Sequence, residues 1–262
     1  MSQPSVQSLL SSAHDSGDLS KETLRALTVG DIGAKIQAAL GTPIDNITAT
    51  EVILVSLLID DSGSIRFVPG NTEAVREGHN LIIESLKKSK QSGDVLVHCR
   101  YLNGTVLYPY QPIDQVTPMD QHNFNPDGST PLYDELAVLL GTVLAKAREY
   151  SDNGIAVRTI TLIVTDGHDQ HSVRQTTKTV SAIVADLLRA ETHIVAGMGV
   201  DDGHTDFRQI FREMGILDQW ILTPGNSPSE IRKGFQVFSQ SAARASQNAG
   251  TFSQTAIGGF AG

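Results

Sequence analysis

The sequence predicts an α/β fold of the doubly wound type, with a mostly parallel central sheet, one antiparallel edge strand and helices on both faces. Residues 53–59 form a continuous apolar run that is too short for a membrane span and is typical of a strand buried on both faces. A second such run covers residues 159–165, with helical periodicity between the two. Asn103-Gly104 predicts a hairpin and an antiparallel edge, because both residues tolerate a positive φ.

From residue 51 onward the predicted strands and helices alternate, which places residues 51–245 in one domain. Strands are expected over residues 53–59, 94–101, 105–110, 159–165, 192–200 and 220–222. Helices are expected over residues 71–86, from 130, from 172, around 207–211 and from 227. Pro131 suits a first helical position, Ser172 is predicted to cap the helix that follows it, and Ser227 with Glu230 forms a capping box.

The two ends of the chain differ from this domain in composition. Residues 1–50 are predicted to form an N-terminal arm, loosely held up to about residue 18 and followed by short helices that begin at Ser20 and Asp31. These helices are interpreted as a flap packed on the domain, with a docking element for a partner as the alternative. Residues 246–262 are rich in Ser, Ala, Gln and Gly, which is typical of a disordered tail.

The overall composition limits the classes of partner. The 262 residues are 40% hydrophobic, enough to bury a sizeable core, and the formal net charge is -9. This charge, without a basic stripe, argues against nucleic acid and against an anionic membrane surface, and it suits a divalent cation or a basic protein. The single cysteine, Cys99, is interpreted as a buried core residue. The sequence shows neither a signal peptide nor a membrane span, so we expect a cytoplasmic protein.

Polar oxygen-bearing residues follow three of the predicted structural elements. Asp60, Ser62 and Ser64 come directly after the first strand, Thr130 follows a long polar loop, and Asp166 follows the strand at 159–165. The carboxyl ends of parallel strands meet at one edge of such a sheet, where ligands bind. Hydroxyl and carboxylate oxygens suit Mg²⁺, with Mn²⁺ or Ca²⁺ as further candidates. The sequence therefore predicts a metal site made of these five residues.

The three motifs together resemble the von Willebrand factor type A (vWA) domain, over roughly residues 50–240. They are Asp60-x-Ser62-x-Ser64, Thr130 within Gly-Ser-Thr-Pro-Leu, and Asp166 within Thr-Asp-Gly. The resemblance implies a Rossmann-like fold in which the five residues form a metal-ion-dependent adhesion site (MIDAS). It implies that Ser62, Ser64 and Thr130 contact the metal directly or through water, that Asp60 and Asp166 hold it largely through water, and that an acidic residue of a partner protein completes the coordination.

The resemblance implies a non-enzymatic, Mg²⁺-dependent protein-interaction module, and the sequence lacks a Gly-x-Ser-x-Gly elbow and a Walker A loop. The chain looks like the intracellular bacterial members of the family, such as TerY-like proteins, which implies an adaptor beside AAA+ ATPases or kinase and phosphatase partners. A metal-dependent phosphoryl-transfer or phospho-acceptor domain is one alternative, because Asp60-Asp61 follows a first strand. A structural subunit with an incidental metal is another.

Several other features have two interpretations each. His168 and His171 with Asp169 form a possible zinc pair, but a polar rim is favoured because a third ligand is missing. Asp201, Asp202 and Asp206 are interpreted as a solvated acidic turn rather than a second cation site. In the long loop, Met119 and Phe124 are either exposed anchors for a partner or side chains that hold the loop down.

Overall fold

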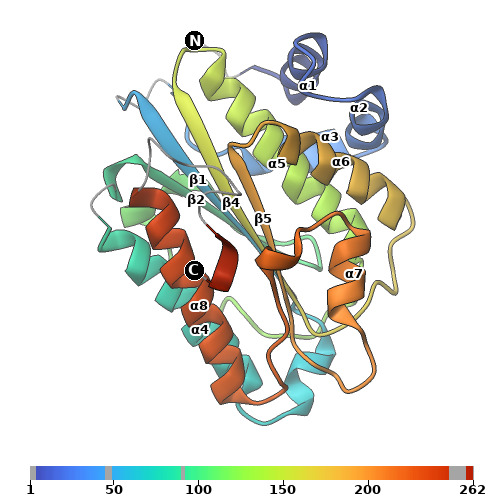
Figure 1. Cartoon of the computed structure of the whole chain (residues 1–262), viewed down its shortest axis with the longest axis vertical. Helices are drawn as coiled ribbons and strands as arrows, with labels where there is room; N and C mark the ends of the chain where they lie inside the picture. The colour runs from blue at the N-terminus through green and yellow to red at the C-terminus, as the bar shows by residue number, and fades with distance from the viewer. Residues whose placement is uncertain (1–3, 45–48, 90–91, 248–257, 262) are drawn as a thin grey trace.

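The computed structural model describes residues 4–44, 49–89, 92–247 and 258–261. A six-stranded sheet in the order β3-β2-β1-β4-β5-β6 forms the centre, and only β3 runs antiparallel to its neighbour. Helices lie on both faces of this sheet (Figure 1). The predicted doubly wound α/β fold with an antiparallel edge is therefore confirmed.

The strands are β1 (Glu51–Ile59), β2 (Val95–Tyr101), β3 (Val106–Pro112), β4 (Ala156–Thr165), β5 (His193–Gly199) and β6 (Ile221–Leu222). The α-helices are α1 (Val6–Asp15), α2 (Lys21–Thr28), α3 (Ile32–Ala39), α4 (Asn71–Lys87), α5 (Leu132–Ser151), α6 (Thr177–Arg189), α7 (Phe207–Glu213) and α8 (Pro228–Gln247). Short 3-10 turns include η2 (Gly63–Phe67), η4 (Ile113–Gln115), η5 (Asp218–Trp220) and η7 (Gly259–Ala261).

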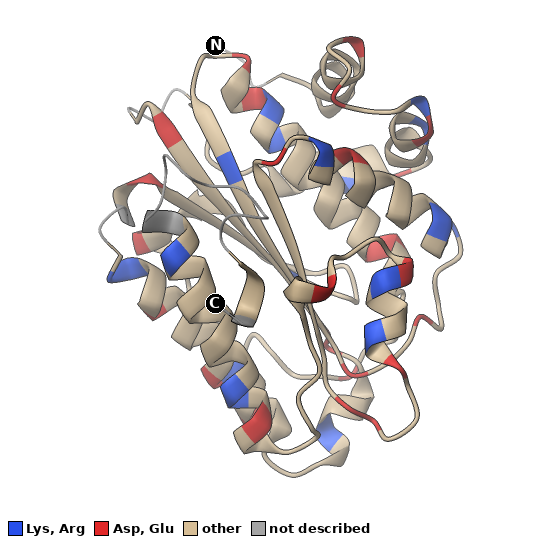
Figure 2. Cartoon of the chain, viewed as in Figure 1, with Lys and Arg blue, Asp and Glu red and all other residues tan. Residues whose placement is uncertain are grey.

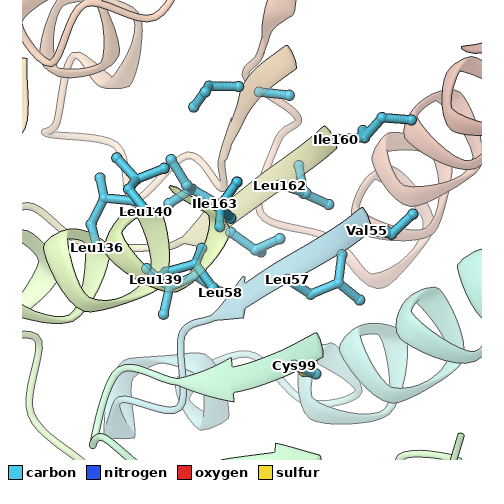
Figure 3. Close-up of a cluster of buried hydrophobic side chains, with 14 of the residues drawn as sticks. Val55, Leu57, Leu58, Cys99, Leu136, Leu139, Leu140, Ile160, Leu162 and Ile163 are labelled. Atoms are coloured by element: carbon cyan, nitrogen blue, oxygen red, sulfur yellow. The ribbon is translucent and has the colours of Figure 1, made fainter. Parts of the chain in front are cut away.

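The core forms on both faces of β1 and β4, because successive side chains of a strand point to opposite faces. Leu58 and Ile163 pack toward α5, whereas Leu57 and Leu162 lie on the face of α4 and α8 (Figure 3). Every residue of β1 after Glu51 is buried, as expected of a central strand in a parallel sheet. Cys99 is also fully buried in this core, as predicted.

The N-terminal helices pack on α5 and α6, as the flap interpretation predicts. Residues 6–15 form α1 and bury Val6, Leu9 and Leu10, so the expectation of a loosely held segment up to residue 18 is wrong. The Ser-rich composition hid this helix, although Ser5 caps it by accepting a hydrogen bond from the Ser8 N–H. Asp31 precedes α3 as predicted, but its carboxylate pairs with Arg174 instead of capping the helix.

The hairpin between β2 and β3 has a different turn from the one predicted. The Gly104 N–H donates to the Tyr101 carbonyl (3.1 Å), and Gly104 has a φ of +90°, whereas Asn103 does not have a positive φ. The Tyr101 N–H also donates to the Thr105 carbonyl (2.9 Å), so residues 102–104 form a three-residue turn instead of a two-residue one, with glycine alone in the left-handed conformation. The hairpin itself and its antiparallel pairing are confirmed.

The segment after β4 also departs from the prediction. The helix α6 begins at Thr177 with Thr176 as its cap, and Ser172 lies in the preceding loop. Ser172 instead accepts a hydrogen bond from the Asp134 N–H (3.0 Å), so it caps the first turn of α5 from another part of the chain. Val173, in the same loop, is 86% exposed. Pro131 is the N-cap of α5 rather than its first helical residue.

The C-terminal segment returns to the sheet. In the described residues 258–261, the ring of Phe260 contacts Trp220 edge-on, with centroids 5.3 Å apart, and contacts Phe238 at 6.3 Å. The expectation of a disordered tail falls largely on residues 248–257, which lie outside the described residues. The division into an arm, a domain of residues 51–245 and a tail stays a prediction.

Candidate metal site

Two aspartates stand side by side at the C-terminal edge of the sheet, because β1 and β4 are parallel neighbours. Asp60 follows β1, and Asp166 follows β4. Asp60 accepts hydrogen bonds from the Ser62 N–H at Oδ1 (2.8 Å) and from the Thr165 hydroxyl at Oδ2 (2.7 Å). Figure 2 shows acidic positions on the loops at this lower end of the sheet.

Two hydroxyls bridge the loop after β1 to Asp166. The Oδ1 atom of Asp166 accepts hydrogen bonds from the hydroxyls of Ser64 (2.8 Å) and Ser62 (3.2 Å), which lie 2.9 Å from each other. The predicted residues Asp60, Ser62, Ser64 and Asp166 therefore meet in one hydrogen-bonded cluster, and the loop bends around Gly63, where the following 3-10 turn begins.

This cluster holds more negative charge than its surroundings favour. Burial raises the pKa of Asp60, although hydrogen bonds from Ser62 and Thr165 oppose the shift. Burial and the nearby Asp60 raise the pKa of Asp166 to about 7, against the lowering effect of its two serine donors. Ionising two neighbouring buried carboxylates together is unfavourable in free energy, and a bound cation would offset this cost.

Thr130 lies just before α5, whose N-cap is Pro131. Its methyl carbon lies 4.0 Å from the position of a Cβ added at Gly167, directly after Asp166. Its backbone N–H donates to Nδ1 of His171 (3.1 Å), and its carbonyl accepts from the Gln170 N–H (3.1 Å). The structure thus places Thr130 beside the loop after β4, and its role as the fifth member of the site stays a prediction.

Asp61, considered from the sequence only for a phosphoryl-transfer alternative, connects three loops of this edge. Its carboxylate accepts from the Asn103 N–H in the β2–β3 turn (3.0 Å). Its carbonyl accepts from the N–H groups of Asp127 (2.8 Å) and Gly128 (2.9 Å) in the long loop. Burial raises the pKa of Asp61 to about 6, and the charge of Asp60 adds to the shift. Only its position after Asp60 could have indicated this role.

The residues around the cluster have structural partners. Asp169 accepts from the Tyr133 N–H (3.2 Å) and the Ser172 hydroxyl (2.5 Å). The Asp134 carboxylate accepts from the N–H groups of Val173 (3.0 Å), Arg174 (3.1 Å) and Gln175 (2.7 Å). This exchange fixes the loop after β4 against the first turn of α5, and it is a polar rim of the kind predicted for His168 and His171.

The other candidate metal sites gain no further ligands. Among residues 4–44, 49–89, 92–247 and 258–261, no three His, Cys, Asp or Glu side chains are grouped so as to hold a metal. Asp202 accepts hydrogen bonds from the His204 N–H (2.9 Å) and from Thr205, and Asp206 caps α7, as in a structural acidic turn. Met119 and Phe124 are 2% and 0% exposed, so they hold the long loop down.

Comparisons with known proteins bear on the fold. No protein-family model matches the sequence, and no curated protein is similar to it. Among solved structures, proximal thread matrix protein 1 from the mussel byssus is 15% identical, with a TM-score of 0.50 over 74% of this chain and 48% of that one. The pilus adhesin SpaC from Lactobacillus rhamnosus GG, in its open conformation, is 12% identical, with a TM-score of 0.53 over 76% of this chain and 30% of that one.

The chain has a Rossmann-like vWA fold. The mussel protein is among the solved vWA structures that share it. The chain spans about half the length of the mussel chain (48%) and about a third of the SpaC chain (30%). Within the described part of the chain, every helix is too short or too polar to span a bilayer.

Proposed function

We propose that this chain is a non-enzymatic protein-interaction module, in which a divalent cation held at the sheet edge is completed by an acidic residue of a partner. The observation that carries this proposal is the convergence of the Ser62 and Ser64 hydroxyls on one oxygen of Asp166. Three segments far apart in the sequence supply this cluster, and four of its members are buried: Asp60, Ser62, Thr130 and Asp166.

The donor set fits a hard cation. Carboxylate and hydroxyl oxygens are preferred by Mg²⁺, and Mn²⁺ or Ca²⁺ can use the same groups. Asp60, Ser62, Ser64, Thr130 and Asp166 would hold the ion, and the serine hydroxyls would exchange their hydrogen bonds to Asp166 for contacts with it. A cation held by two carboxylates and three neutral hydroxyls would attract one further carboxylate from a partner.

Two solved structures of similar fold support this interpretation. The mussel protein has also been solved with a zinc-occupied MIDAS motif, and SpaC is described as a pilus adhesin. We extend the proposal to an adaptor within the cell, with a protein partner such as an AAA+ ATPase, a kinase or a phosphatase, and without nucleic acid or membrane as partners.

Titration calorimetry with Mg²⁺ and Mn²⁺ tests the site. We expect binding to the wild-type chain, strong loss in Asp166→Asn and Ser64→Ala, and unchanged binding in Asp114→Asn, because Asp114 is an exposed acid at the opposite edge of the sheet. Equal metal binding by Asp166→Asn would contradict the site. Turnover of a generic phosphate ester that disappears in Asp60→Asn would contradict the non-enzymatic role.

A further inference from the structure

Two large apolar side chains are far more exposed than the rest of the described chain. Phe67 is 82% exposed and Val173 is 86% exposed, whereas the next, Val29, is 53% exposed. Each follows an aspartate of the candidate metal site by the same number of residues, from Asp60 to Phe67 and from Asp166 to Val173. A single exposed apolar side chain is common on a protein surface, so it is the position of both residues beside the candidate metal site that bears on binding.

The two residues lie on the two loops that follow the aspartates of the site. Phe67 ends the 3-10 turn that contains Ser64, and the chain continues from it into α4. Val173 follows His171, which contacts Thr130, and the chain continues from it into α6. The helices α4 and α6 lie on opposite faces of the sheet (Figure 1). Phe67 and Val173 therefore lie on two loops that border the candidate metal site.

The backbone is held in place at both residues. The Val173 N–H donates to the Asp134 carboxylate (3.0 Å), and Phe67 belongs to the 3-10 turn η2. The charged neighbours are already paired, Arg66 with Asp127 (3.2 Å) and Arg174 with Asp31. A partner would thus meet apolar side chains on an ordered backbone beside the metal, and an ordered backbone loses less conformational entropy on binding.

We propose that the partner's acidic residue lies in an apolar segment, with large aliphatic or aromatic side chains before and after it that pack on Phe67 and Val173. This inference rests on the proposed function, since the acidic residue is the one that completes the metal. It names the chemistry of the partner, an acid flanked by apolar residues, and it makes Phe67 and Val173 determinants of specificity.

The test uses the full chain in Mg²⁺ and a displayed library of random linear peptides, with bound peptides released by EDTA. We expect the released peptides to share an acidic residue with apolar residues on both sides. Binding of a selected peptide should weaken about tenfold in Phe67→Ser and in Val173→Ser, from loss of buried apolar area. It should be unchanged in Leu217→Ser, which alters a 41% exposed residue just before η5, at the opposite edge of the sheet.

The outcomes separate the two proposals. Released peptides that contain an acidic residue without apolar neighbours, or equal binding by the Phe67→Ser and Val173→Ser variants, would overturn this inference and leave the proposed function intact. An absence of EDTA-released peptides with an acidic residue would contradict the proposed function itself. Mg²⁺ affinity measured on each variant should stay unchanged, which shows that the serine substitutions have not damaged the metal site.

Discussion

Arg100 of β2 and Glu135 of α5 form an ion pair whose side chains are only 1% and 5% exposed. Lys35 of α3 contacts the second oxygen of the same carboxylate at 2.8 Å. Glu135 lies in the first turn of α5, close after Thr130, and the Arg100 guanidinium also approaches the Gly104 carbonyl (3.5 Å). One buried carboxylate thus joins the sheet, the N-terminal helices and the helix that positions Thr130.

Glu135→Gln should destabilise the protein by about 3–5 kcal/mol, because it leaves the Arg100 charge buried without a counterion. Urea unfolding measures this loss. The matched control is Glu22→Gln, which removes an exposed contact with Lys178 (3.8 Å) and should cost less than about 1 kcal/mol. The double variant Arg100→Met, Glu135→Met should recover most of the lost stability. Equal losses of unfolding free energy in Glu135→Gln and Glu22→Gln would contradict a buried pair.

Asp166→Asn should stabilise the metal-free protein at pH 8 by about 1–3 kcal/mol, because it removes one of two neighbouring buried carboxylates. The same change should abolish the rise in melting temperature that Mg²⁺ gives the wild-type chain. Thermal unfolding with EDTA and with Mg²⁺ measures both effects. A wild-type response to Mg²⁺ in this variant would show that the ion binds elsewhere.

The buried His98 should make the fold sensitive to acid. Its Nδ1 atom donates to the Tyr108 carbonyl (2.9 Å), while burial and the charge of Arg100 lower its pKa to about 3. The native pKa of His98 lies below the ordinary value near 6.5. The contribution of neutral His98 to the free energy of unfolding is therefore complete above pH 6.5 and is lost as the pH falls toward 3. Near pH 4.5 the loss should reach about 2–3 kcal/mol.

His98→Gln retains an N–H donor but cannot titrate, so the slope of unfolding free energy against pH should flatten between pH 6.5 and 4.5. His122→Gln, on the exposed part of the long loop, is the matched control and should keep the wild-type slope. Identical slopes in all three proteins would assign the acid sensitivity to other groups, such as His79 and His193, whose pKa values burial lowers to about 4.

The N-terminal helices approach α5 closely at Gly141. A Cβ added there would lie 2.6 Å from Ile36 Cδ1 and 2.9 Å from Leu27 Cδ2. Gly141→Val should therefore displace α2 and α3 and increase amide hydrogen exchange in residues 20–40. Gly33→Ala is the control, since nothing lies within 4 Å of its added Cβ, and it should leave exchange unchanged or stabilise α3 slightly.

Trp220 is the only tryptophan of the chain and reports on the C-terminal segment. Phe260→Ala removes the ring that contacts Trp220, so the emission of Trp220 should shift to longer wavelength as water replaces that ring. Phe252→Ala lies outside the described residues and serves as a comparison in the same tail. Equal spectra for the wild type and Phe260→Ala would contradict the contact.

The sequence was sufficient for the sheet, the antiparallel edge and the grouping of Asp60, Ser62, Ser64 and Asp166, because these follow from where apolar runs end. It was insufficient where a side chain bonds to a distant segment. Ser172 was assigned to the helix after it, but it caps α5. Asp61 and Thr165 form hydrogen bonds to residues of neighbouring loops, and the spacing of residues along the sequence does not reveal such bonds. The helix α1 was missed because its four buried residues are interspersed with three serines.

Asp61 links three loops at the edge of the sheet to one another. The turn at Asn103, the long loop at Gly128 and the loop after β1 share this one residue as an anchor. Their fluctuations should therefore be correlated, so that a pull on any one of them is transmitted to the other two. If a partner bound at this edge were pulled, the force would be shared by the three loops and the strands that they join, and not carried by a single loop.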